Sequence, residues 1–557
     1  MTLVERRLGI LFAVFVAALG AATLKAGHLG LIKGDGLSAA ATSQQQAEQV
    51  VLARRGAIVD RSGVALAASE PADDVSATPY LVERPVSAAA KLAPLLGIDE
   101  TELIKKLARR GAGAGSGFVY LARRVPPAVA DDVKALGIAG IDLAAGSRRT
   151  YPHGMLAAQV LGSVNLDGKG LFGLEYANDK ALRGTHGERV SVYNGERKAI
   201  EVRDVRTAVP GATMKLTLDA EIQDRTEEVL QQVARDFSPK GASAIVMDPR
   251  DGSVLAMANW PRIDANDLSR VPAWALQNRA VGFTHEPGST FKAFTVAAAL
   301  EEGEVTPRTK FNLPPQIRLY DRVIGESHPR GWVTLDTSGI LAQSSNVGAI
   351  KIGQRLGAKR FDHWVRRFGF GKPTGIGLPG EERGVALDLE DYSGSSMGNL
   401  PIGQGELVTP IQVAAGYAAI ANGGVLRQPR VVEQVGGETV PEAPGRRVIS
   451  SRTAYEVRKM LKGVFAPGGT ASEVSIPGYE LAGKTGTANK INIATGEYSD
   501  EDYVASFVGF APADKPKLLI SVMVDEPRGA IYGGEVAAPA FGKIASFALP
   551  YLRIAPK

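Results

Sequence analysis

The sequence predicts an α+β protein with an N-terminal membrane helix, a middle region of small elements, and a C-terminal domain whose antiparallel sheet is sandwiched by helices. Three observations predict this fold class. An uncharged, mostly apolar run, residues 8–24, follows two arginines near the N-terminus. Residues 50–210 alternate short strands and helices with Gly turns. From residue 211 on, β-rich runs stand at both ends of a mostly helical stretch, so we expect strands from the two ends to share one sheet.

Composition excludes several classes of function. The chain has 557 residues, 45% apolar and 22% charged, which is ordinary for about three or four globular domain-sized units. The net charge of +5 is small and no basic tract is interleaved with aromatics, so we expect no nucleic-acid partner. There are no cysteines, and the six histidines stand at no metal-ligand spacing. We therefore expect neither a metal nor another cofactor.

The N-terminus predicts a membrane anchor. Residues 1–7 form a short tail with Arg6 and Arg7, and the run Leu8–Leu24 reaches roughly 25 Å as a helix, near the lower limit for crossing a bilayer. The positive charges favour a cytoplasmic tail, with everything after Lys25 outside. A cleaved signal peptide is the competing interpretation, although the apolar run would be long for one. A buried core helix is a further alternative that the polar residues after the run disfavour.

The region after the anchor divides into a stalk and a loosely built domain. Residues 25–49 are mixed and polar and suit a stalk. Residues 54–69 predict two short strands around a tight turn at Asp60–Gly63. A helical pattern over residues 88–110, and short helices with Gly turns over residues 148–184, complete an α+β domain of structural or docking type, residues 50–210.

The last region, residues 211–557, begins and ends with strands. Residues 213–237 predict a strand followed by an amphipathic helix, and residues 241–259 predict a β-hairpin around Asp248–Gly252. Helical patterns dominate the 290s and the 330s to 360s. Strand patterns return in residues 479–488, 503–513 and 517–527, and a final helix is predicted over residues 533–549.

Ser289 and Lys292 form an S-x-x-K motif at the start of a predicted helix. Pro287 and Gly288 mark a turn before it, and the helix should end at Gly303. Residues three apart lie on one helix face, so the Ser hydroxyl and the Lys amine could come within hydrogen-bonding reach at the positive end of the helix. That arrangement can activate a nucleophile. An N-capping Ser beside a surface Lys is the alternative, because an S-x-x-K spacing arises by chance about once or twice in such a chain.

Two other fragments decide between these interpretations. In "AQSSNVGA", Ser344 and Asn346 offer a hydroxyl and an amide from a turn between two helical patterns, although such residues are more often helix caps. In "LAGKTGTANK", Lys484–Thr487 stand at the edge of a predicted strand, where Gly486 leaves space for an approach to the backbone. A β-turn is the alternative for this fragment.

The order S-x-x-K, then S-x-N, then K-T-G resembles that of the penicillin-binding transpeptidases, D,D-carboxypeptidases and serine β-lactamases. Further segments extend the resemblance over nearly all of the chain after the anchor. "RGAIVDRSGVALA", "RRTYPHGMLAAQVLG" and "GLFGLE" are similar to N-terminal and pedestal motifs of class B penicillin-binding proteins, and "GGEVAAPAF" is similar to their closing helix. No segment reads as a glycosyltransferase domain, which argues against the bifunctional class A enzymes.

The resemblance implies both a fold and a reaction. Residues 50–210 would be an elongated pedestal of the penicillin-binding protein dimerisation type. Residues 211–557 would be a transpeptidase domain with a five-stranded antiparallel sheet sandwiched by helices. The protein would be a serine-type D,D-transpeptidase in which Ser289 attacks the carbonyl between the terminal D-alanines of a peptidoglycan stem peptide. An acyl-enzyme would form, and an amine from a neighbouring stem would complete the cross-link.

The same resemblance implies roles for the motif residues. Neutral Lys292 would take the Ser289 proton, with Lys484 lowering its pKa. Ser344 would pass a proton to the leaving amine, and Asn346 would orient Lys292 and the substrate amide. The N–H groups of Ser289 and Thr487 would form the oxyanion hole. Thr485 and Thr487 hydroxyls, with Lys484, suit the substrate carboxylate, and Thr485, Gly486 and Thr487 are the expected substrate-binding set, along which a peptide could lie as an added strand.

The resemblance also implies a setting. "NRAVGFTHEPGSTFKAFT" is similar to the cell-division (septal, FtsI-type) enzymes, whereas Gln404 stands where many septal enzymes carry an aromatic, which keeps an elongation-type enzyme open. The implied location is the inner (cytoplasmic) membrane, single-pass, with the catalytic domain extracytoplasmic. Implied partners are stem peptides ending in D-Ala-D-Ala, β-lactams, a SEDS-type membrane glycosyltransferase and other division proteins. A β-lactam sensor or lactamase would not need the long pedestal, and a catalytically silent scaffold would be expected to lose a motif.

Overall fold

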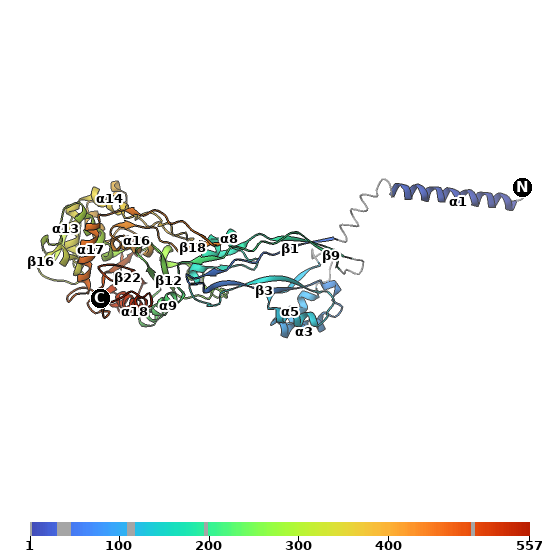
Figure 1. The fold of residues 1–557 in the computed structure, drawn as a ribbon, viewed down its shortest axis with the longest axis horizontal. Coiled ribbons are helices and arrows are strands. Elements are labelled where there is room, and N and C mark those ends of the chain that lie inside the picture. The colour runs from blue at the N-terminus through green and yellow to red at the C-terminus, as the bar shows by residue number, and fades with distance from the viewer. Residues whose placement is uncertain (1–2, 30–45, 109–116, 194–198, 492–495, 557) are drawn as a thin grey trace. The chain divides into compact units, whose positions relative to one another are not determined.

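The computed structural model describes residues 3–29, 46–108, 117–193, 199–491 and 496–556 of the chain (Figure 1). The chain divides into two compact units. One unit consists of residues 1–54 and 184–211, and the other of residues 55–183 and 212–557. All the residues of the three sequence motifs belong to the second unit.

A long helix opens the first unit. Helix α1, Leu3–Gly27, has 25 residues and extends the predicted apolar run at both ends, where the flanking Arg and Lys residues are good helix formers. Its segment Arg6–Gly27 has a mean hydropathy of 2.1 and is long and apolar enough to cross a membrane, judged by length and composition. The helix is therefore consistent with a single-pass anchor.

The first unit also contains a three-stranded antiparallel sheet. Strand β1, Gln46–Val51, pairs with β8, Gly187–Tyr193, and β8 pairs with β9, Ala199–Arg206. An ion pair of 2.6 Å joins Arg189 on β8 to Asp204 on β9. The last residues of the predicted stalk thus belong to a sheet, and their polar sequence gives no alternation that would indicate a strand. Residues 30–45 of the predicted stalk lie outside the described residues.

In the second unit, one sheet joins the pedestal region to the C-terminal region. Its seven strands are β2 (Ile58–Val59), β3 (Ala65–Ala77), β4 (Val119–Val125), β5 (Ile141–Thr150), β10 (Met214–Leu216), β18 (Val432–Val435) and β19 (Glu438–Thr439). They run in the order β19-β18-β10-β2-β3-β4, with β5 also paired to β3. Between β2 and β3 the predicted tight turn is confirmed, because Asp60 N–H donates to Val64 O at 2.8 Å and Gly63 N–H donates to Asp60 O at 3.1 Å.

Small helices cover the pedestal strands. Helices α3 (Pro85–Leu96), α4 (Glu100–Leu107) and α5 (Pro127–Ala135) share an apolar cluster with β3 and β4. Fully buried Leu92 and Leu103 lie in this cluster. The elements that follow are short, as predicted, and comprise α6 (Ala158–Leu161), β6 (Ser163–Val164), β7 (Gly170–Phe172), α7 (Gly173–Ala177) and α8 (Asp179–Arg183).

Three pedestal segments that are distant in the sequence meet at one buried carboxylate. Glu175, at the end of "GLFGLE", accepts from Arg55 Nε and from Arg149 Nε, each at 2.6 Å. Arg55 Nη1 also lies 2.7 Å from Asp179. The Glu175 side chain is 0% exposed, so its charge is tolerated only because two guanidinium groups surround it. The segments that resemble family motifs therefore converge on a single ionic contact.

The C-terminal region is built on a five-stranded antiparallel sheet in the order β12-β11-β23-β22-β21. Strands β11 (Gly241–Met247) and β12 (Val254–Trp260) form the predicted hairpin. Strands β21 (Ala482–Ile491), β22 (Tyr498–Ala511) and β23 (Leu518–Asp525) come from the end of the chain, and β23 pairs with β11. This pairing confirms that strands from the two ends of the region share one sheet. Strand β21 lies at the edge of the sheet.

Helices cover both faces of this sheet. Helices α9 (Ala220–Phe237) and α18 (Gly533–Tyr551) pack on one face, as Figure 1 shows. Side chains alternate along β11, so Ala244 and Val246 join the α9 and α18 core while Ile245 and Met247 join the core of the opposite face. That opposite core is formed mainly by α10 (Arg279–Gly282), α11 (Lys292–Glu301), α12 (Thr337–Ala342), α13 (Asn346–Leu356), α14 (Ala358–Arg367), α16 (Pro410–Ala421) and α17 (Ser451–Leu461).

The remaining elements are short strands and turns around the helical side. The strands are β13 (Lys310–Leu313), β14 (Gln316–Leu319), β15 (Arg322–Gly325), β16 (Val333–Asp336), β17 (Val425–Leu426) and β20 (Arg446–Arg447). The short helices are η2 (Pro79–Leu81), η3 (Ala273–Leu276), η4 (Gly288–Phe291), η5 (Leu389–Asp391), α15 (Ser396–Asn399), η6 (Leu400–Ile402) and η7 (Lys462–Phe465).

Candidate active site

Ser289 lies in the single turn η4, which leads directly into α11. The prediction of Ser289 in the first turn of a helix is thus confirmed. The turn is anchored by Gly288, whose N–H donates to Gly403 O at 3.0 Å. Gly288 has a φ of +52°, and a Cβ at this position would lie 2.9 Å from Thr487 O. Glycine therefore allows both the left-handed backbone and the close approach of this turn to β21.

Lys292 is completely buried and points at the turn between α12 and α13. Its Nζ donates to Ser344 O at 2.6 Å and to Asn346 Oδ1 at 2.6 Å, and it lies 3.4 Å from Ser344 Oγ. The direct hydrogen bond to Ser289 that the helical spacing suggested is not found among the described residues. The Lys292 amine instead donates to acceptors on the Ser344–Asn346 turn, which the spacing of the S-x-x-K motif alone could not reveal.

The Ser344–Asn346 turn combines a helix cap with contacts to Lys292. Ser345 is the N-cap of α13 and accepts from Gly348 N–H at 3.0 Å, so the capping interpretation holds for this residue. Ser344 has a φ of +57°, a left-handed conformation that is uncommon for a residue with a Cβ. Such strain persists where surrounding contacts determine it, and it often marks functional sites.

Glu326, which belongs to no sequence motif, holds this turn in place. Its Oε1 accepts from Ser345 Oγ and its Oε2 accepts from Asn346 N–H, both at 2.6 Å. Arg330 Nη2 donates to the same carboxylate at 2.8 Å. The Asn346 amide is fixed further, because its Nδ2 donates to Gly325 O at 2.9 Å. Glu326 lies about twenty residues before the S-x-N motif, and no sequence periodicity connects the two.

The K-T-G motif lies on edge strand β21, and its hydroxyl groups have partners. Buried Lys484 Nζ lies 3.2 Å from Thr485 O and 3.3 Å from Thr485 Oγ1. Thr470 Oγ1 is 2.8 Å from Thr485 Oγ1, and Gly533 N–H donates to Thr487 Oγ1 at 3.1 Å. The structure therefore brings the K-T-G residues to a free sheet edge, with the two threonine hydroxyls held in fixed positions.

Neighbouring parts of the same chain leave no room for a side chain at Gly486. A Cβ there would lie 2.3 Å from Ser506 Oγ, 2.9 Å from Thr290 Cγ2 and 3.0 Å from Pro287 O. The groups that approach this glycine are therefore Ser506 of the neighbouring strand β22 and the turn that carries Ser289. The sequence interpretation identified the need for space at Gly486 but did not identify the neighbour, because the contact joins segments almost two hundred residues apart.

Burial lowers the pKa of both lysines. Desolvation lowers the pKa of Lys292 to about 7, the nearby Glu326 carboxylate opposes this shift, and Arg330 adds to it. Desolvation also holds the pKa of Lys484 well below its ordinary value, and the charge of Lys292 contributes in the same direction. A neutral amine is therefore accessible at Lys292 near physiological pH.

Ser289, Ser344, Thr485 and Thr487 line one cleft of about 530 Å³. The cleft is also lined by residues 326–330, residues 468–473 and residues 532–535. Across it, the rings of His328 and Tyr532 lie 4.9 Å apart. Thr470, His328 and Tyr532 carry no sequence motif that would have selected them. Within the described ranges, no three His, Cys, Asp or Glu side chains are grouped in a way that could hold a metal ion.

Comparison with known families assigns both regions. Residues 242–546 match the penicillin binding protein transpeptidase domain, and residues 50–216 match the penicillin-binding protein dimerisation domain. The second match ends at β10, the strand that joins the pedestal sheet.

Individual proteins match over almost the whole chain. Penicillin-binding protein PbpB of Mycolicibacterium smegmatis is 36% identical over 96% of this chain and 88% of its own length. The peptidoglycan D,D-transpeptidase FtsI of Escherichia coli is 34% identical over 91% of this chain and 85% of its own. A crystal structure of penicillin-binding protein 3 from Mycobacterium tuberculosis with aztreonam has a TM-score of 0.72 and 31% identity, over 91% of this chain and 98% of that one. The chain therefore belongs to the class B penicillin-binding proteins and is a serine-type peptidoglycan D,D-transpeptidase.

Proposed function

We propose that Ser289 is the acylated nucleophile and that Lys292 is its general base. The observation that carries this proposal is the position of Lys292, which is buried, has a lowered pKa and contacts only uncharged oxygens of Ser344 and Asn346. Because no carboxylate pairs with its Nζ among the described residues, the neutral form that can accept a proton is not suppressed. Ser289 and Ser344 line the same cleft, and Lys292 Nζ lies 3.4 Å from Ser344 Oγ. We propose that a proton passes between the two hydroxyls through Lys292.

The other motif residues then bind the donor substrate. Backbone N–H groups of Ser289 and Thr487 form the oxyanion hole, an effect worth about 3 to 4 kcal/mol for each donor in enzymes of this type. Thr485 and Thr487 bind the terminal carboxylate, since their hydroxyls are fixed by Thr470 and by Gly533 N–H and can donate into the cleft. Strand β21 accepts the peptide as an added strand, because its outer edge has no strand partner among the described strands.

Acylation by β-lactams follows from the same geometry. A β-lactam presents an amide carbonyl beside a carboxylate, as the D-Ala-D-Ala terminus does, and the amine that leaves remains tethered to the acyl group. A relative of known structure carries aztreonam in its complex. We propose that this chain is acylated by β-lactams at Ser289 and that the acyl-enzyme persists.

We propose that the enzyme cross-links peptidoglycan during cell division, as a single-pass protein of the cytoplasmic membrane with its catalytic domain outside. Helix α1 supports the anchor, and the similarity of the Ser289 segment to septal enzymes supports the division role. Since the family matches include no glycan polymerase, we expect a SEDS-type membrane glycosyltransferase and other division proteins as partners. Gln404 keeps the second candidate, an elongation-type enzyme, open.

A localisation and depletion experiment separates the two candidates. A fluorescent fusion that replaces the native copy should concentrate at division sites, and depletion should produce filaments with unfinished septa. Label spread along the side wall, with depleted cells that become round, would instead establish the elongation role. A fusion carrying Ser289→Ala serves as the control, because it should localise like the native protein but fail to support growth.

A further inference from the structure

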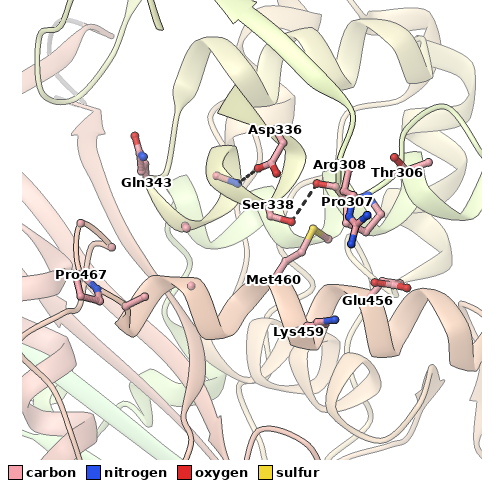
Figure 2. Close-up of a pocket in the computed structure, with 16 residues that line it drawn as sticks. Thr306, Pro307, Arg308, Asp336, Ser338, Gln343, Glu456, Lys459, Met460 and Pro467 are labelled. Atoms are coloured by element: carbon pink, nitrogen blue, oxygen red, sulfur yellow. Dashed lines mark hydrogen bonds between the residues drawn. The ribbon is translucent and has the colours of Figure 1, made fainter. Parts of the chain in front are cut away.

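A second hollow, of about 680 Å³, adjoins the cleft that contains Ser289. Figure 2 shows its walls, which are residues 306–308, the ends of α12 and the C-terminal half of α17. One wall is fixed by Ser338 Oγ, which donates to Pro307 O at 3.1 Å, and another by Asp336, which accepts from Gly339 N–H at 2.7 Å. A volume of this size is typical of a ligand-binding pocket.

The two hollows share lining residues and therefore adjoin each other. Gln343, Gly468 and Gly469 line both of them. Gln343 directly precedes Ser344, and its Oε1 accepts from Arg330 Nη1 at 3.0 Å. Gly469 directly precedes Thr470, whose hydroxyl lies 2.8 Å from that of Thr485. The second hollow is therefore reached from the Ser344 and Thr485 side of the cleft.

That side is where the leaving group must depart. In the proposed reaction, the terminal D-alanine carries its carboxylate to Thr485 and Thr487, and its amine leaves from the acyl carbonyl beside Ser344. The attacking amine must approach the same carbonyl from the position that the first amine vacated, because aminolysis of the ester reverses the geometry of its formation. An acceptor that enters from the second hollow would meet this requirement.

The charges of the second hollow suit a peptide that carries carboxylates. Arg308 and Lys459 are exposed in its walls, and neither forms an ion pair among the described residues. The lining contains two acidic residues, Asp336 and Glu456. Asp336 accepts a hydrogen bond from the N-terminus of α12. In Figure 2, Arg308 and Glu456 are at one end of the hollow, whereas Gln343 and Pro467 are at the end that joins the cleft.

We propose that this hollow, lined by Arg308 and Lys459, binds the acceptor stem peptide, an acidic peptide whose side-chain amine attacks the acyl-enzyme. The inference rests on the proposed role of Ser289. The amine nitrogen bonds to the acyl carbonyl carbon as the ester bond to Ser289 Oγ breaks, and the proton that nitrogen loses returns to Ser289 Oγ. An amide cross-link and free enzyme result, and no further reactant is needed.

The test compares two acceptors on one acyl-enzyme. The full-length protein in detergent is acylated by a small D-alanyl thioester, and the products of aminolysis and hydrolysis are separated by mass. One acceptor is a soluble acidic stem peptide with a free side-chain amine, and the other is D-alanine, which is too small to require the second hollow. The double variant Arg308→Glu/Lys459→Glu is compared with Lys359→Glu/Lys543→Glu, an equal charge reversal at exposed lysines that line neither hollow.

The expected result is a loss confined to the peptide acceptor. Replacing two attractions by two repulsions should lower aminolysis by the stem peptide about tenfold relative to hydrolysis. Thioester hydrolysis, penicillin acylation and aminolysis by D-alanine should match those of the control variant. An equal loss with both acceptors, or no loss beyond that of the control, would overturn the acceptor assignment. A native protein that is not acylated by the thioester would contradict the proposed function of Ser289 instead.

Discussion

The rate at which penicillin acylates this protein should rise with pH around neutrality, because Lys292 must be neutral to accept the Ser289 proton. A lysine with an ordinary pKa of 10.5 is neutral in about 0.1% of molecules at pH 7.5, whereas a pKa of about 7 makes about three quarters of them neutral. Burial thus raises the population of the active base roughly 700-fold. The rate should therefore be low in acid, pass its half-maximal value near pH 7, and level off above it.

Two substitutions should move this profile in opposite directions. Glu326→Gln removes a negative charge that favours protonated Lys292, so the midpoint should move to lower pH. Arg330→Gln removes a positive charge that disfavours protonation, so the midpoint should move to higher pH. Both residues lie in the same loop, so each variant serves as the control for the other. Glu326→Gln should also lower the maximal rate, because the carboxylate accepts from Ser345 and from Asn346 N–H.

The assay is the second-order rate constant for labelling by a fluorescent penicillin, measured from about pH 5 to about pH 9 in buffers of constant ionic strength. Thermal unfolding at each pH separates loss of structure from loss of reactivity. A rate that stays flat through neutrality would refute the assignment of Lys292 as the base. Midpoints that move in the same direction in the two variants would refute the electrostatic reasoning.

Three further predictions follow from individual contacts. Ser289→Ala should abolish covalent penicillin labelling and leave the unfolding temperature unchanged, since Ser289 Oγ makes no hydrogen bond among the described residues. Persistent labelling would contradict the assignment of Ser289 as the nucleophile. Gly486→Ala should slow labelling and lower the unfolding temperature, because its Cβ would lie 2.3 Å from Ser506 Oγ and 2.9 Å from Thr290 Cγ2 in the Ser289 turn. Unaltered values would show that these neighbours move away readily. Glu175→Gln should destabilise the protein by about 3 to 5 kcal/mol in urea unfolding, because it removes the carboxylate that pairs with two buried arginines. As a control, Glu70→Gln, at an exposed pair with Arg148, should change the urea unfolding midpoint little.

Local patterns predicted the parts of the fold that depend on neighbours in the chain. The hairpin of β11 and β12 follows from two β-rich runs around a turn, and the Ser289 turn follows from a Pro-Gly pair before an apolar helix. The pairing of N-terminal with C-terminal strands was also predictable, since strand patterns stand at both ends of a helical stretch and each set alone would leave unpaired backbone groups at its edge. The roles of Ser289, Lys292, Ser344, Asn346 and Lys484 remain proposals that came from motif order.

Contacts between distant segments were not predictable. Strand β10 joins the pedestal sheet, although its sequence marks it only as a strand before a helix. Residues 46–49 of β1 fall within the predicted stalk, because backbone pairing with β8 leaves no signature in side-chain alternation. Glu326 and Thr470 reach the motif residues through loops, so only the folded chain shows which hydroxyl or N–H group each of them contacts.

The position of Glu326 accounts for how this site can hold a strained turn and still keep its lysine neutral. The left-handed Ser344 needs a strong neighbouring contact, and Glu326 supplies one through Ser345 Oγ and Asn346 N–H. Among the described residues, however, no ion pair joins Glu326 to Lys292 Nζ, whose partners are uncharged oxygens. A direct carboxylate contact would raise the pKa of Lys292 and remove the base at neutral pH. The fold thus separates the stabilising charge from the amine by two hydrogen bonds through Asn346. From there it fixes Asn346, and therefore the direction of Lys292, without holding its proton.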